Sequence, residues 1–269
     1  MPGSQAHKPV LEHANEDPGG CGRPPAAEKK HTSIFIIACP RPQVGKTFVA
    51  RLLIDFLRLK GTDPVVFDLN PSGDALCDYL PGLARVADLS EIRSQMVMFD
   101  RLIVDDAIAK VVDLSHTSFE RFFTIAQEIA FFKEAVGRSI EPVVLFVADP
   151  HSVAINAYAD LCSRLQGGIT IPVFNDGTLK GQKLRKEFPF ARAAAVPLYI
   201  SALSPMLKAQ MEKSRSSFAD VHERLPPGIP IGLAFELRSW TRRTFLEFRE
   251  LELRLLLEKL RASLPGLRL

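Results

Sequence analysis

The stretch that decides the fold is residues 33–47, which read SIFIIA, CPRPQV and GKT in succession. Residues 33–38 form a short, continuous apolar run, which is typical of a β-strand buried on both faces. The next residues are mostly turn formers, and apolar residues then recur at helical spacing from Lys46 to Lys60, where Gly61 ends the pattern. A buried strand, a turn and an amphipathic helix in this order predict the first β–α unit of an α/β fold.

The same alternation continues along the chain. Strands are predicted at 64–67, 101–104, 142–148, 169–174 and 194–200, and helices at 74–80, 88–98, 118–136, 153–165, 206–224 and 236–262. Strands that alternate with helices favour parallel pairing through right-handed crossovers. We therefore predict a doubly wound, mostly parallel sheet flanked by helices, formed by residues 32–269 as one domain. Residues 1–31 are polar and without apolar periodicity, and we predict a disordered tail there.

The composition is that of a soluble globular protein, with 46% hydrophobic and 24% charged residues. The net charge of +3 is too small to indicate nucleic acid or an anionic membrane as a partner. The four cysteines have neither metal-ligand spacing nor a disulfide pattern, which favours a reducing compartment. The start of the chain lacks a signal-peptide pattern, and no apolar run approaches the ~18–20 residues needed to cross a bilayer. We predict a cytoplasmic protein.

The segment after the first strand is where chemistry is expected, because open parallel sheets bind ligands beyond the carboxyl ends of their strands. Gly45 lets the backbone approach a phosphate, and the first amides of the following helix attract an anion. Lys46 would reach the β- and γ-phosphates, and the Thr47 hydroxyl would ligate Mg²⁺. The alternative is a chance Gly-Lys-Thr at a strand–helix turn. The confirming context favours a nucleoside triphosphate site.

Three stretches are similar, in sequence and in order, to the motifs of one enzyme family. They are Arg41-Pro42-Gln43-Val44-Gly45-Lys46-Thr47, then Asp68-Leu69-Asn70-Pro71-Ser72-Gly73, then Phe99-Asp100-Arg101-Leu102-Ile103-Val104-Asp105. They resemble the phosphate loop, the Asp-x-Asp stretch and the Walker B strand of the ParA/MinD family of P-loop ATPases. A weaker resemblance to the TraL-type plasmid-transfer ATPases comes from Val111-Val112-Asp113-Leu114-Ser115-His116.

The resemblance implies a slow, dimeric ATP switch that positions or transfers DNA or other cargo. The homodimer would form around the nucleotide, with Arg41 in place of the lysine that reaches across to the partner's ATP. The loop residues that would bind nucleotide are Gln43, Val44, Gly45, Lys46, Thr47 and Phe48. Thr47 and Asp105 would hold Mg²⁺, and Asp68 would support the site. Asn175 would contact adenine, although an Asn-Asp-Gly turn at the end of a strand is an equal interpretation.

Three departures from the family pattern predict weak catalysis. Pro42 has no N–H to offer a phosphate, and Gln43 carries a Cβ where the backbone needs a positive φ. Asn70 replaces the aspartate that orients the attacking water in the family, and an amide cannot accept a proton from that water. Two alternatives stay open: a partner-binding scaffold with little or no turnover, and a ligase of the dethiobiotin-synthetase type.

Two further segments bear on partners. The predicted helix 236–262 has an apolar stripe that comprises Trp240, Phe245, Phe248, Leu251 and Leu255. We predict that this stripe packs on the core rather than on a membrane, because glutamates offset the arginines of the helix and a sheet needs cover on both faces. A basic cluster is formed by Lys180, Lys183, Arg185 and Lys186. We interpret it as a solvated face rather than a DNA contact.

Overall fold

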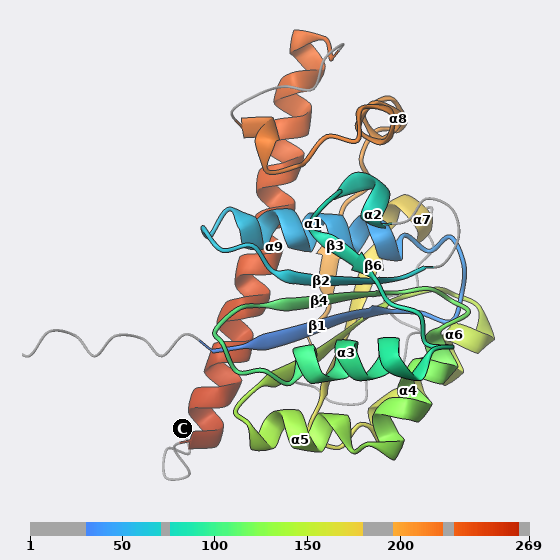
Figure 1. Cartoon of the computed structure of the whole chain (residues 1–269). Coiled ribbons are helices and arrows are strands. Elements are labelled where there is room, and N and C mark those ends of the chain that lie inside the picture. The colour runs from blue at the N-terminus through green and yellow to red at the C-terminus, as the bar shows by residue number, and fades with distance from the viewer. Residues whose placement is uncertain (1–30, 71–75, 180–195, 223–228, 264–269) are drawn as a thin grey trace, which may run out of the picture. The chain divides into compact units, whose positions relative to one another are not determined.

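The computed structural model describes residues 31–70, 76–179, 196–222 and 229–263 (Figure 1). These residues belong to one compact unit, His31–Leu269. The basic cluster at 180–186 and the predicted tail up to residue 30 lie outside the described residues. Among the helices that are described, none combines the length and hydropathy needed to cross a membrane.

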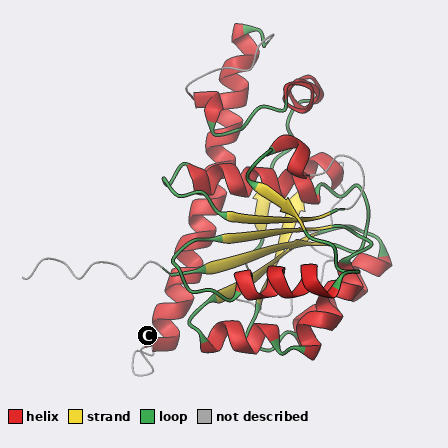
Figure 2. Ribbon diagram, in the orientation of Figure 1, coloured by secondary structure: helices red, strands yellow, loops and turns green. Residues whose placement is uncertain are grey.

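The centre of the fold is a parallel sheet of seven strands in the order β3-β2-β4-β1-β5-β6-β7 (Figures 1 and 2). The strands are β1 (Ser33–Ala38), β2 (Val65–Leu69), β3 (Ala84–Val86), β4 (Lys110–Leu114), β5 (Glu141–Val147), β6 (Ile169–Asn175) and β7 (Leu198–Ile200). All of the neighbouring pairs run parallel. The doubly wound α/β fold predicted from the sequence is confirmed.

Helices cover both faces of the sheet, as right-handed crossovers require. They are α1 (Lys46–Arg58), α2 (Leu76–Tyr79), α3 (Ile92–Leu102), α4 (Phe119–Glu128), α5 (Phe131–Gly137), α6 (Ser152–Arg164), α7 (Asp176–Leu179), α8 (Pro205–Ser214) and α9 (Ile231–Ser263). Helix α1 packs on β1 and β4, and α9 packs on α1 and β7. Helices α3, α4 and α5 lie together on the other face (Figure 1).

The predicted apolar stripe of the terminal helix is buried, so its core-packing role is confirmed. Trp240, Phe248 and Leu251 are each less than 4% exposed. The Phe248 ring stacks on Phe56 of α1 at 5.7 Å. The Trp240 indole N–H donates to the Ser201 carbonyl oxygen at 2.9 Å, just beyond β7. Helix α9 therefore packs against both α1 and the edge strand β7.

The prediction of a strand at 101–104 is wrong. Those residues complete α3 and its following turn, and the buried residues Met98, Phe99 and Leu102 have helical spacing. The strand that lies between β1 and β2 is β4, which begins at Lys110. This charged residue interrupts the apolar pattern, but its ammonium is buried in the fold, where it pairs with Asp106 and donates to the Val104 carbonyl at 2.7 Å.

Other differences from the predicted elements are smaller. The helix expected at 118–136 is two helices, α4 and α5, which are separated at Ala130, where φ is 52°. Strand β3 has three residues and gave no alternating pattern to read. Short elements such as this are specified by their neighbours in the sheet more than by their own sequence.

Candidate functional site

A cavity of about 820 Å³ lies at the carboxyl ends of the central strands. The chain leaves β1 toward β2 on one side and later passes from β4 to β5 on the other side of β1. The direction of strand addition thus reverses at β1, and this is where a doubly wound sheet opens a crevice for a ligand. Residues from the loop after β1, from the first turns of α1 and from the ends of β2, β4 and β6 line the cavity.

The loop between β1 and α1 has the backbone geometry of a glycine-rich loop although Gly45 is its one glycine. Gln43 has φ of 57° and Gly45 has φ of 90°. A Cβ added at Gly45 would lie 2.4 Å from the Asn175 amide nitrogen, so glycine is required there. The prediction that Gln43 occupies a positive-φ position is confirmed, and a non-glycine residue in this region is strained.

The first turn of α1 directs its backbone N–H groups toward the loop. The first backbone bond of this helix runs from the Val49 amide to the Gly45 carbonyl at 3.0 Å. The amides of Lys46, Thr47 and Phe48 precede it, and such amides bind anions at helix N-termini. The ring of Phe48 packs instead against Phe218, with 5.7 Å between centroids.

Lys46 brings a positive charge into the middle of the loop. Its ammonium donates to the Arg41 carbonyl at 2.7 Å. Burial lowers the pKa of Lys46, and the nearby Cys39 and Asp113 oppose that shift. The Lys46 ammonium is poorly hydrated and donates to a neutral carbonyl. A phosphate that entered the cavity could therefore replace that carbonyl as its hydrogen-bond acceptor.

The carboxylate beside Thr47 is Asp113, on β4. It pairs in register with Ile37 of β1 and with Asp68 of β2. Burial raises the pKa of Asp113 to about 7; the Thr47 hydroxyl and Lys46 lower it, and Asp68 raises it. Neither of its buried carboxylate oxygens has a hydrogen-bond partner of ordinary geometry among the described residues. Buried acceptors that have no such partner are expected where water, an ion or a ligand binds.

The structure does not bring Asp105 to the site. Its carboxylate accepts a hydrogen bond from the Thr32 hydroxyl at 2.7 Å, and Thr32 directly precedes β1. Asp105 is therefore at the amino end of the sheet, whereas Thr47 is at the carboxyl end. The carboxylate that lies beside Thr47 is instead that of Asp113, in the stretch that resembles the TraL-type ATPases.

Asp68 and Asn70 lie beside this carboxylate. The Asp68 carboxylate is fully buried and accepts the Asn70 amide at 2.9 Å and the Cys77 amide at 3.1 Å. It thereby joins Asn70, just after β2, to Cys77 in α2. Asn70 itself lines the cavity. In the described part of the chain, no three His, Cys, Asp or Glu side chains cluster as a metal site. A cation here would depend on Thr47, Asp113, water and the ligand's own oxygens, as Mg²⁺ commonly does.

Asn175 braces the loop. Its amide nitrogen donates to the Val44 carbonyl at 3.3 Å, and its oxygen accepts the Gly177 amide at 3.2 Å. The Thr178 hydroxyl donates to the same Val44 carbonyl at 3.2 Å. Asn175 ends β6, Asp176 and Gly177 begin α7 in place of the expected turn, and the adenine contact of Asn175 stays a prediction. The sequence gave no signal for Thr178.

Arg41 is held within its own chain. Its guanidinium Nε lies 3.7 Å from the Asp149 carboxylate, which follows β5. The predicted contact across a dimer stays a prediction. A second arginine that the sequence analysis missed, Arg51, lines the cavity one turn after Thr47 and stacks on the Tyr79 ring at 3.8 Å.

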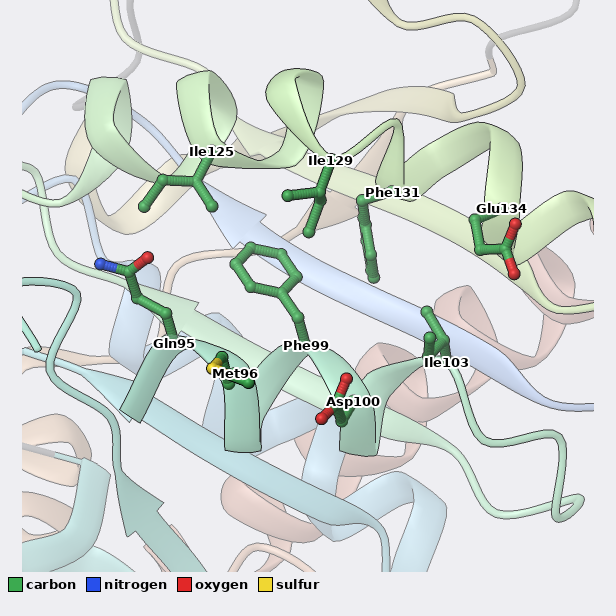
Figure 3. Close-up of a pocket in the computed structure, with 9 residues that line it drawn as sticks. All are labelled: Gln95, Met96, Phe99, Asp100, Ile103, Ile125, Ile129, Phe131 and Glu134. Carbon is green, nitrogen blue, oxygen red and sulfur yellow. The ribbon is translucent and has the colours of Figure 1, made fainter. Parts of the chain in front are cut away.

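A second hollow of about 310 Å³ lies between α3 and the α4–α5 pair (Figure 3). Figure 3 shows the Phe99 ring pointing toward Ile125 and Ile129. The charged residues that line it are Asp100 and Glu134, and no described lysine or arginine does so. It is therefore unsuited to phosphate.

No family model and no curated protein matches the chain. The resemblance to ParA/MinD proteins rests on the loop and on residues 68–73, of which 71–73 lie outside the described residues. The third similar stretch, 99–105, lies in α3 and the turn after it.

Proposed function

We propose that the protein binds a nucleoside triphosphate together with Mg²⁺ in the cavity at the carboxyl ends of β1 and β4, with ATP as the expected nucleotide. The observation that carries this proposal is the convergence of Lys46, Thr47 and Asp113 on one cavity. They come from the loop, the first turn of α1 and the neighbouring strand. A chance Gly-Lys-Thr turn gives no reason for the buried carboxylate of Asp113 to lie beside it.

Each group has a distinct role in this proposal. Lys46 would exchange the Arg41 carbonyl for phosphate oxygens, and the first amides of α1 would bind the same phosphates. The Thr47 hydroxyl and the Asp113 carboxylate would hold Mg²⁺ and its water, the usual arrangement in P-loop proteins. Bound Mg²⁺ would neutralise charge on the phosphates. The braces from Asn175 and Thr178 would keep the loop in its binding conformation.

Part of the cavity lining suits a base. Ala202 and Leu203, which follow β7, and Pro205, which begins α8, are apolar, and they line the cavity together with Lys208 and Glu212 of α8. Burial of a planar base against apolar side chains would stabilise the bound nucleotide. The volume of the cavity is also sufficient for a nucleotide. The nucleotide would then extend from Lys46 to the segment between β7 and α8.

Calorimetric titration of the full chain tests this proposal. ATP is titrated with excess Mg²⁺ and again with EDTA, and GTP is titrated in parallel. The expected result is saturable binding that weakens when Mg²⁺ is removed. Absence of binding with Mg²⁺ present would sink the proposal.

Turnover is a separate part of the proposal. Asn70 lines the cavity where the family places the water-orienting aspartate, so we expect slow hydrolysis that drives a dimeric switch for cargo. The alternative, a scaffold with no appreciable turnover, is favoured by the same residue together with the strained Gln43.

Asn70→Asp separates these alternatives. A restored carboxylate can accept a proton from the attacking water, and general-base catalysis contributes about 10²-fold or more. We expect phosphate release to rise by that factor over a slow but measurable native rate. The matched control is Asn156→Asp on the exposed face of α6, which should leave the rate unchanged. A native rate at background that Asn70→Asp lifts above it would support the scaffold, and a brisk native rate would exclude it.

A further inference from the structure

The outer face of α9 carries a second apolar stripe that the core does not use. It consists of leucines that are 42–55% exposed: Leu246, Leu253, Leu256, Leu257 and Leu260. At about 100° per residue, these positions lie opposite Phe248, Leu251 and Leu255, which are buried against the core. We call these five residues the leucine stripe. Exposed apolar stripes of this kind mark an interaction surface.

The spacing of the leucine stripe fits a helical partner. Leu246, Leu253 and Leu260 recur every seven residues, and Leu256 and Leu257 fall between the last two. This is the pattern of a seam between two helices packed side by side. The stripe spans roughly 21 Å along the helix.

The charges around the leucine stripe favour protein over membrane. Residues 246–261 hold as many basic as acidic side chains: Arg249, Arg254, Lys259 and Arg261 against Glu247, Glu250, Glu252 and Glu258. Arg261 pairs with Glu258 at 3.1 Å, and Arg254 pairs with Glu250. A helix that lies on an anionic membrane carries an excess of Lys and Arg on its polar face. The balance here suits a partner that has both signs of charge.

A second copy of the same helix meets these conditions when it runs antiparallel. Arg249 occupies the seam position between Leu246 and Leu253, so a parallel pair would place two arginines opposite each other. Antiparallel pairing about a twofold axis near Leu253 places Arg249 beside Leu257 of the other copy. It also brings Glu250 of each copy near Arg254 of the other, and a twofold contact of this kind is self-complementary.

The leucine stripe lies away from the nucleotide cavity. Glu252 on α9 pairs with Lys60, beyond the end of α1, at 2.6 Å. Lys259 contacts His31 at 2.9 Å, just before β1. Both contacts are at the amino end of the sheet. We infer that the leucine stripes of two chains pair antiparallel to form a dimer that does not require nucleotide. A dimer contact around the nucleotide would then use the opposite end of the sheet, where the strands have their carboxyl ends.

Sedimentation equilibrium of the full chain without nucleotide tests this inference. The wild type is expected to be a dimer, and Leu253→Glu is expected to raise the dissociation constant at least ~30-fold, because it places a charge at the twofold axis. The matched control is Val97→Glu on α3, where the side chain is 59% exposed on the other face of the sheet. It should remain a dimer. Circular dichroism checks that both variants are folded.

Cross-linking tests the direction of pairing. Leu253→Cys should form a covalent dimer with a short bismaleimide, because the axis brings the two residues 253 together, whereas Val97→Cys should not. A wild type that is monomeric at every concentration overturns the inference, as does equal dissociation by Val97→Glu. Leu253-dependent binding of a monomer to phosphatidylserine vesicles would overturn it in favour of a membrane surface. These readouts contain no nucleotide, so they are independent of the proposed ATP binding.

Discussion

Lys46→Ala is expected to raise the dissociation constant for MgATP by at least about 100-fold, since a charged hydrogen bond to phosphate contributes about 3 kcal/mol. Lys46 is the one described ammonium at the centre of the loop, where it donates to the Arg41 carbonyl. Without it, the phosphates would lose the ammonium that the first residue of α1 places beside the first amides of that helix. Calorimetric titration of both proteins under identical conditions measures the change.

The control for this experiment is Lys133→Ala, at an exposed position on α5. It removes the same charge from the chain far from the cavity and should leave the affinity unchanged. Burial lowers the pKa of Lys46, so its charge is unfavourable in the nucleotide-free site. We therefore expect Lys46→Ala to lower the free energy of unfolding by no more than about 1 kcal/mol, the value of one hydrogen bond. Equal MgATP affinity for Lys46→Ala and wild type would contradict the proposed site.

Asp113→Asn is expected to stabilise the nucleotide-free protein at pH 8 while it weakens Mg²⁺-dependent binding. The pKa of Asp113 is raised from its ordinary 3.8 to about 7 in the folded protein. Between these pH values the folded protein holds a proton that the unfolded chain releases, so the free energy of unfolding falls as pH rises toward 7 and levels off above it. The loss is at most about 4 kcal/mol, because each pKa unit corresponds to about 1.4 kcal/mol. Asparagine carries no charge and avoids this loss.

Urea unfolding at pH 5 and pH 8 measures the effect. Wild type should lose stability between the two, and Asp113→Asn should lose about 3 kcal/mol less, because two pH units separate pH 5 from the pKa of about 7. Asp78→Asn, an exposed position on α2, serves as control and should follow the wild type. Titration of ATP with and without EDTA should show that Asp113→Asn has lost most of the Mg²⁺ dependence. An identical pH dependence of stability in both proteins would show that Asp113 does not titrate as described.

The strand, loop and helix of residues 33–58 were predictable because their determinants are local. A continuous apolar run, a glycine at the turn and a 3.6-residue period are all properties of adjacent residues. The same holds for the positions of Lys46 and Thr47 at the start of a helix, from which their proposed roles follow. The packed face of α9 was also predictable, since its periodicity extends over many turns.

The choice of carboxylate depends on the tertiary structure. Asp105 and Asp113 both follow short apolar runs, and local pattern favours neither. Sheet pairing decides, because β4 lies beside β1 and carries Asp113 to Thr47, while α3 ends at Leu102 and leaves Asp105 at the other end of the sheet. Lys110 can occupy a buried position in β4 because its ammonium pairs with the partly exposed carboxylate of Asp106.

The sequence by itself determined that a loop ending in Gly-Lys-Thr stands between a buried strand and a helix, because the determinants of these elements are neighbouring residues. Only the tertiary structure decided what surrounds the loop. Asn175 is 131 positions from Val44 along the chain, yet its amide fixes the Val44 carbonyl. The same folding buries one apolar stripe of α9 and leaves the leucine stripe exposed. Such contacts follow from strand order and helix packing, which no local pattern specifies.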